Sequence, residues 1–236
     1  FITLSCGAVS GFHSTQSPLM SRCLRNEKYG RPVFYGAMIS EGVIALVWAS
    51  VGLTLYDPQA LQEVISRGSA ALVVSETAIS LLGTTGGFLA IMGVVVLPIT
   101  SGDTAFRSAR LIISEAARVS QRPILKRLFI AVPLFASGFI LTQVDFGVIW
   151  RYFGWSNQTL ATLVLWTSAF YLARQGSRHW IATIPATFLT AVIITFICYS
   201  PIGFNLEYPI SVTLGIIVAL AAFFYFLFFI AKPRTI

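Results

Sequence analysis

Residues 7–18, with the sequence GAVSGFHSTQSP, bring together polar side chains that can bind a small anionic or polar ligand. Two glycines and a proline stand among a histidine, a glutamine and four hydroxyl side chains. Because glycine and proline interrupt helices, we expect a broken helix here, at Gly7, Gly11 and Pro18. A broken helix exposes backbone N–H and C=O groups that can bind ions and carboxylates. The candidate ligand-binding residues are His13, Ser14, Thr15 and Gln16.

Two acidic residues are candidates for proton transfer. Glu41 is the ninth residue of an apolar stretch at 33–53, so we expect it near the middle of a membrane-spanning helix. An ionisable group at that depth must be protonated, paired or hydrated, which suits a residue that takes up and releases a proton. A protonated carboxyl that only hydrogen-bonds a neighbouring helix is the alternative. Asp103 follows another apolar stretch, where it could lie on the proton path or only cap a helix.

Small and hydroxyl residues also cluster in the segment GTTGG, residues 83–87. Thr84 and Thr85 could line a cavity there or bind Na+ through their hydroxyl groups. The alternative, which applies to residues 7–18 as well, is that small residues only allow neighbouring helices to pack closely.

Asn157 and Gln158 follow an aromatic cluster at 150–155, which suits a membrane interface. The apolar stretch that begins with them is short for a span, so their amides would dip below the lipid headgroups. We expect both amides to contribute to substrate binding.

The composition of the rest of the chain is suited to a lipid bilayer. Of its 236 residues 56% are hydrophobic and only 11% are charged, whereas soluble domains carry about 25% charged residues. Apolar stretches long enough to cross a core of about 30 Å predict membrane-spanning helices. We therefore expect an all-α, polytopic membrane helix bundle with six spanning helices and a broken N-terminal segment. The predicted spans are 33–53, 71–99, 124–144, 157–173, 180–199 and 208–230.

Lysine and arginine alternate between rich and poor connections. The connections at 21–32 and 100–127 carry four and six of them, against one each at 54–70 and 145–156. This alternation follows the positive-inside rule, so we expect the basic connections and the C-terminus in the cytoplasm. The net charge of +7 is then explained by topology and not by nucleic-acid binding.

The longest basic connection, residues 101–122, has a helical periodicity of its own. Apolar residues recur on one face and arginines on the other, which predicts an amphipathic helix at the membrane surface. We expect Ser101 or Asp103 to cap it and Pro123 to end it. It would either anchor two spans to lipid headgroups or act as a moving gate. We expect residues 1–236 to form a single membrane domain, which is a fragment of a longer protein.

The sequence contains no Walker A loop, no HExxH motif and no GxSxG motif. Its two histidines cannot form a conventional zinc site. We therefore expect no enzyme activity and neither a bound metal nor a cofactor.

Several of these segments resemble the carbon starvation protein A family of bacterial inner-membrane transporters. The resemblance extends from Ser5 to about Ala173 and is weaker over the last two spans. It rests on the segments CGAVSGFHSTQSPLMSRC, GRPVFYGAMISEGVIALVWA, PITSGDTAFRSARLII and IWRYFGWSNQTLA.

The resemblance implies a secondary carrier of the bacterial inner membrane, related to the amino acid, polyamine and organocation transporter superfamily. Family members are associated with the uptake of peptides or of pyruvate, the latter coupled to protons. Residues 7–18 would bind a carboxylate, and a peptide would need in addition an acidic partner such as Glu41. The expected partners are a small carboxylate or peptide, a proton or Na+, membrane lipids and further helices N-terminal to Phe1. A membrane sensor or assembly subunit that binds the same ligand without transporting it is the alternative.

Overall fold

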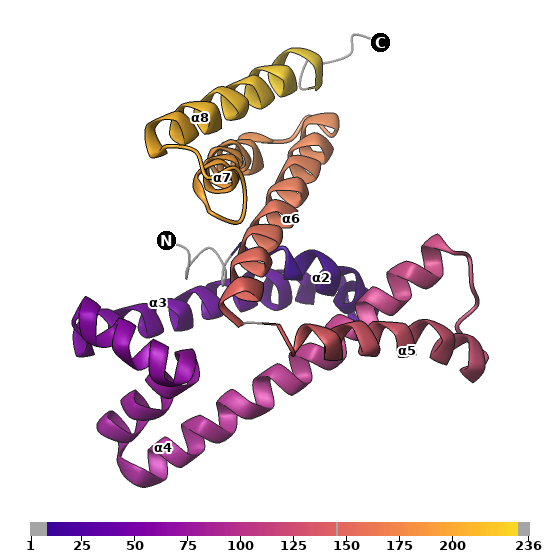
Figure 1. Ribbon diagram of the computed structural model, residues 1–236. Coiled ribbons are helices and arrows are strands. Elements are labelled where there is room, and N and C mark those ends of the chain that lie inside the picture. Colours follow the sequence, from indigo (N-terminus) through magenta and orange to yellow (C-terminus); the bar gives the residue numbers. More distant parts are fainter. Residues whose placement is uncertain (1–8, 145, 231–236) are drawn as a thin grey trace. The chain divides into compact units, whose positions relative to one another are not determined.

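The computed structural model describes residues 9–144 and 146–230, and every regular element within them is a helix (Figure 1). The chain divides into two compact units. The first comprises Cys23–Gly138, and the second comprises the described residues before Cys23 and after Gly138. The predicted all-α class is confirmed, whereas a single membrane domain over residues 1–236 stays a prediction.

Five helices within the described residues are long and apolar enough to cross a membrane. They correspond to five of the six spans predicted from the sequence, and the last two have the predicted bounds. The remaining predicted span, 157–173, lies inside a longer helix, Phe146–Arg174, which is not among these five. The five helices are Glu27–Leu55, Ala71–Ala116, Ile124–Leu141, Trp180–Tyr199 and Tyr208–Ile230.

The first unit begins with two short, irregular helical turns. A 3₁₀ turn, η1 (Glu27–Tyr29), and a π-helix, η2 (Arg31–Gly36), lead into α3 (Ala37–Leu55). Asn26 begins this series, because its side chain accepts a hydrogen bond from the N–H of Lys28. The long helix α4 (Pro58–Ala116) and helix α5 (Ile124–Leu141) follow.

Helix α4 is not straight, because its backbone is left-handed at Gly83, where φ is +68°. A Cβ built on Gly87 would lie 3.1 Å from the Cα of Ile79. In a straight helix two residues eight positions apart are separated by about 12 Å. The helix therefore folds back at Gly83, which adopts this conformation without the penalty of larger residues (Figure 1). Two helical arms therefore meet at this glycine, inside the stretch 71–99 that the sequence predicts as one span.

The predicted amphipathic helix at 101–122 is not a separate element. Helix α4 continues without interruption through Ser101 and Asp103 to Ala116, so the prediction that one of them caps a new helix is wrong. The physical reason is that the preceding turns already accept hydrogen bonds from these backbone N–H groups. The helix also ends before Pro123, at Ala116, and Arg118 then adopts a φ of +54°.

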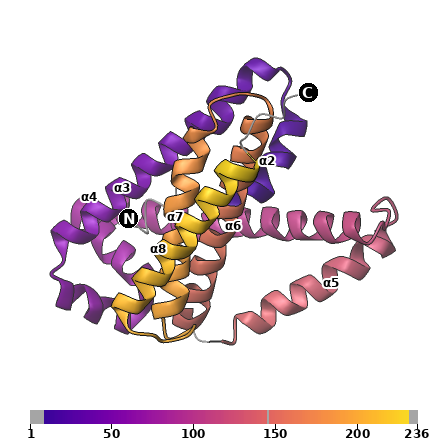
Figure 2. The same ribbon diagram turned by 90° about the horizontal axis from the view of Figure 1, so that it is seen from above.

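The second unit contains a bundle in which α6 (Phe146–Arg174) and α8 (Tyr208–Tyr225) both pack on α7 (Trp180–Tyr199) (Figure 2). The π-helix η3 (Phe226–Ile230) extends α8. Helix α2 (Phe12–Cys23) precedes this bundle in the sequence. Aromatic residues close one end, where Phe226 packs against Trp166 and His179.

Small residues allow α7 and α8 to approach closely. The buried residues of α8 are Ser211, Gly215 and Ala219, which are spaced four apart on one face. A Cβ on Gly215 would lie 2.7 Å from the backbone oxygen of Ala191 on α7, so only glycine fits. This spacing of small residues is typical of membrane helix pairs, whose association depends on packing and not on hydropathy.

Helix α6 begins at Phe146, well before the predicted span start at Asn157. The aromatic cluster at 150–155 therefore belongs to the helix and does not precede it. Aromatic residues have only a moderately lower helix propensity than alanine, and the single Gly154 is tolerated. Asn157 consequently lies in the helix interior, and the prediction that it begins the span is corrected.

Among the residues that the structure describes, four helices contain a proline in their interior, and none of these helices ends at that proline. The prolines are Pro18 in α2, Pro98 in α4, Pro133 in α5 and Pro185 in α7. The predicted interruption at Pro18 is therefore wrong. A proline removes one helical hydrogen bond, and membrane helices tolerate this loss when neighbouring groups satisfy the freed carbonyl.

Candidate functional site

The candidate site is built around the start of helix α2. Residues 9–11 are not helical, and α2 begins at Phe12. A helix thus begins directly after Gly11, whereas Gly7 lies outside the described residues, so the broken helix stays a prediction. The four predicted ligand-binding residues of this segment, His13 to Gln16, lie in the first two turns of α2 and are half-buried.

Asn157 on α6 caps the start of α2. Its Oδ1 accepts hydrogen bonds from the backbone N–H of Phe12 and from the Oγ of Ser10, both at 3.0 Å. The Asn157 side chain is buried, with 7% of its surface exposed. Capping of this kind is normally local, by a residue that directly precedes the helix. Here a residue 145 positions away supplies the acceptor, so the two segments are held in one arrangement.

Gly11 is where α2 touches the backbone of α6. A Cβ at this position would collide with the backbone oxygen of Asn157 and lie 2.7 Å from the Cβ of Leu160. It would also lie 3.1 Å from the backbone nitrogen of Ala161, which is itself buried. A glycine is therefore required for the Asn157 cap to form.

Two of the predicted hydroxyl donors are already used. The Oγ of Ser14 donates to the carbonyl of Gly11 at 2.6 Å, and the Oγ1 of Thr15 donates to the carbonyl of Phe12 at 2.7 Å. The Nε2 of Gln16, in contrast, is buried and has no hydrogen-bond partner among the described residues. A buried donor of this kind is costly unless a ligand or water satisfies it. Gln16 is thus the best placed of these side chains to donate to a carboxylate.

The neighbours of Asn157 on α6 hold this helix against α7. The indole nitrogen of Trp155 donates to the backbone oxygen of Ile193 at 3.2 Å, and this residue is half-buried. Further along, the indole of Trp166 donates to the Oγ1 of Thr190 at 3.0 Å. Gln158 is half-buried one position after Asn157. Asn157 therefore lies on a helix, α6, that is hydrogen-bonded to α7 through Trp155 and Trp166.

Glu41 lies on α3 in the other unit and is exposed there. It stands at the middle of the apolar span Glu27–Leu55, with 14 residues on either side. Its depth in a membrane stays a prediction. Its role in proton transfer stays a prediction.

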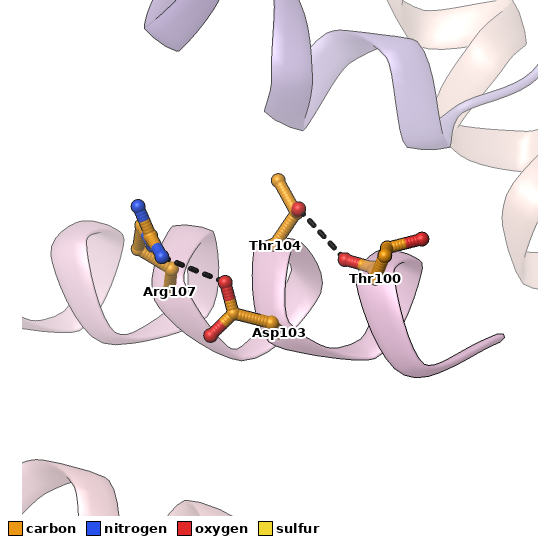
Figure 3. Close-up of polar contacts among 4 residues, drawn as sticks. All are labelled: Thr100, Asp103, Thr104 and Arg107. Carbon is orange, nitrogen blue, oxygen red and sulfur yellow. Dashed lines mark hydrogen bonds and ion pairs between the residues drawn. The ribbon is translucent and has the colours of Figure 1, made fainter. Parts of the chain in front are cut away.

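Asp103 forms an ion pair with Arg107 one turn further along α4, with 2.7 Å between Oδ2 and the guanidinium nitrogen (Figure 3). Both side chains are more than half exposed, so this pair contributes little stability. Thr104 donates to the backbone oxygen of Thr100 on the same stretch. Asp103 therefore pairs with a side chain inside α4 and does not cap a helix.

Thr84 and Thr85 directly follow the bend at Gly83 and are exposed in the first unit. The GTTGG segment therefore begins at a bend in α4. The interpretation of this segment as a helix-packing surface did not predict a bend. Their role as cavity or Na+ ligands stays a prediction. The part of the chain that the structure describes contains no group of three or more His, Cys, Asp or Glu residues that could hold a metal ion.

Ser10 is a site residue that sequence reasoning missed. Its Oγ accepts from the N–H of Phe12 at 3.2 Å while its own proton goes to Asn157. A serine before a helix start is a typical capping residue, so the sequence SGFH contained the signal. Arg107, Arg110 and Arg127 line a groove between α4 and α5. The sequence placed the first two on the polar face of an amphipathic helix but did not indicate a groove shared with Arg127.

Comparison with known proteins relates the chain to bacterial transporters. Over 122 residues it is 55% identical to an uncharacterized protein of Haemophilus influenzae. This match covers 52% of this chain and 88% of that protein. It is 28% identical to the peptide transporter CstA of Bacillus subtilis, over 81% of this chain and 40% of the transporter. Over 59 residues it is 42% identical to the pyruvate/proton symporter BtsT of Escherichia coli, a match to 25% of this chain and 8% of the symporter.

The chain thus spans two fifths or less of the length of these two named transporters. No solved structure matches it. The family model described as carbon starvation protein CstA matches residues 1–82 and 59–196, which together cover most of the chain. The chain therefore belongs to the carbon starvation protein CstA family.

Proposed function

We propose that the complete protein is a secondary active transporter that takes up a small carboxylate such as pyruvate, or a short peptide, together with protons. The observation that carries this proposal is the start of α2, which presents a helix N-terminus and polar side chains within an apolar chain. Interrupted helices at membrane depth are the usual construction of substrate sites in secondary transporters.

The chemistry of this site suits a carboxylate. The N-terminal end of a helix carries a partial positive charge, and its first backbone N–H groups point outward. Asn157 already occupies the N–H of Phe12, so Asn157 positions the helix end and the substrate would bind beside it. Gln16 offers a buried donor without a partner, and the ring of His13 lies one turn away from it. These donors match the carboxylate of pyruvate or the C-terminus of a peptide.

The proton would be carried by Glu41. A carboxyl group in the middle of an apolar span is stable in the membrane when it is protonated or hydrated. Loss and uptake of its proton from opposite sides would link transport to the pH gradient.

The test is uptake of labelled pyruvate and of a labelled dipeptide into proteoliposomes that contain the complete protein, with and without an inward proton gradient. We expect one of the two substrates to accumulate only with the gradient. Gln16→Ala should raise the KM for that substrate several-fold with little change in kcat, because it removes a ligand donor and no part of the coupling. Accumulation that ignores the gradient would remove proton coupling from the proposal.

Counterflow distinguishes transport from the sensor or assembly-subunit alternative. A transporter exchanges labelled for unlabelled substrate across the membrane even without a gradient, whereas a sensor binds the label and never moves it. Binding without exchange of either substrate would therefore overturn the transport proposal.

A further inference from the structure

An open groove of about 470 Å³ lies between the C-terminal part of α4 and the N-terminal part of α5, entirely within the first unit. Arg107 and Arg110 line it from α4, and Arg127 lines it from α5. The connection 117–123 joins the two helices at this end. A volume in this range accommodates a ligand of moderate size.

The groove carries an excess of positive charge. Its one carboxylate, Asp103, is already paired with Arg107. Arg127 donates one long hydrogen bond, of 3.4 Å, to the backbone oxygen of Gln121. Within the described ranges no carboxylate lies at ion-pair distance from Arg110 or Arg127. Two guanidinium groups, one from each helix, therefore lack a compensating anion, and guanidinium forks match phosphate oxygens well.

The other side of the groove is apolar. The rings of Phe106 and Phe135 stack with 4.5 Å between their centres, and Leu134 completes this surface. Phe135 leaves 55% of its surface exposed. Gly138 makes room for the ring of Phe106, since a Cβ there would lie 2.7 Å from its Cζ. A water-soluble anion would gain nothing from this aromatic surface, whereas a lipid would bury it.

We propose that this groove binds the headgroup of an anionic phospholipid such as phosphatidylglycerol. The phosphate lies between Arg110 and Arg127, and an acyl chain covers Phe135 and Leu134. The position supports this occupant, because the groove is lined by the C-terminal part of α4 and the N-terminal half of α5, and both helices are apolar and long enough to cross a membrane. Basic pockets between membrane helices recognise such lipids in this way. The proposal is independent of the transported substrate.

The test measures binding of phosphatidylglycerol to the complete protein by native mass spectrometry and by its effect on thermal unfolding, in about 0.3 M salt to screen diffuse attraction. Arg110→Gln with Arg127→Gln should weaken binding about thirtyfold, taking about 1 kcal/mol for each arginine. The matched control is Arg122→Gln with Lys126→Gln, which removes two positive charges nearby from residues that do not line the groove. We expect that control to retain binding within threefold.

Three results would overturn the proposal. They are equal loss of binding in the control, equal binding of phosphatidylcholine, and the same stabilisation by inorganic phosphate or glycerol phosphate, which would indicate a site for free anions. Phe135→Trp provides a second readout that leaves the arginines intact. Its added fluorescence should be quenched more strongly by brominated phosphatidylglycerol than by brominated phosphatidylcholine. Equal quenching by both lipids would also contradict the proposal.

Discussion

The Oδ1 of Asn157 lies 3.0 Å from the backbone nitrogen of Phe12, so a side chain in the interior of α6 caps the start of α2. This contact links the two parts of the candidate site that the sequence places far apart. It also means that the positive end of α2 is partly neutralised by an uncharged amide, which leaves it attractive to an anion.

Replacement of Asn157 by aspartate separates capping from substrate binding. The carboxylate still accepts the hydrogen bond from Phe12 and is favoured at a helix N-terminus, so we expect thermal unfolding close to that of the wild type. Its charge should repel a substrate carboxylate and weaken apparent affinity by about tenfold, which corresponds to 1.4 kcal/mol. Asn157→Ala should instead lower stability by about 1 kcal/mol. Undiminished affinity in the aspartate variant would contradict a carboxylate site beside this cap.

Gly11→Ala should destabilise the second unit by about 1 to 3 kcal/mol, because its methyl group would collide with Asn157 and Leu160 on α6. The matched control is Gly154→Ala in α6, where a Cβ meets nothing within 4 Å and alanine should stabilise the helix. Thermal unfolding in detergent measures both. Equal behaviour of the two variants would show that α2 does not pack on α6 as described.

Gly83→Ala tests the bend in α4. Alanine in the left-handed conformation costs about 1 to 2 kcal/mol, so this variant should unfold at a lower temperature. Gly93→Ala in the same helix has open space around its Cβ and should be neutral or stabilising. If α4 were straight in the membrane, both substitutions would stabilise it alike.

Glu41→Gln keeps the shape of a protonated carboxyl but cannot exchange a proton. We therefore expect the variant to insert and to exchange substrate in counterflow, while accumulation driven by a pH gradient is lost. Glu63→Gln is the control, since Glu63 lies 4.0 Å from Arg67 in a largely exposed ion pair on α4. Normal gradient-driven accumulation in Glu41→Gln would assign Glu41 a structural role only.

Much of the fold could be predicted because hydropathy and helix length are local properties. The spans Trp180–Tyr199 and Tyr208–Ile230 were predicted with their bounds. The sequence did not predict the local backbone correctly where the same residues are compatible with two conformations. Pro18 can break a helix or be accommodated within it, and the GTTGG segment can continue a helix or bend it, as Gly83 does.

The sequence by itself determined the helical, membrane-spanning class and the candidate polar residues, because an apolar stretch in lipid must satisfy its backbone hydrogen bonds internally. Only the tertiary structure decided that Asn157 caps α2, that Gly11 permits this contact, and that Arg110 and Arg127 line one groove. Such pairings depend on how separate helices pack. Helical periodicity describes which face of one helix is apolar and carries no information about which residue of another helix meets it.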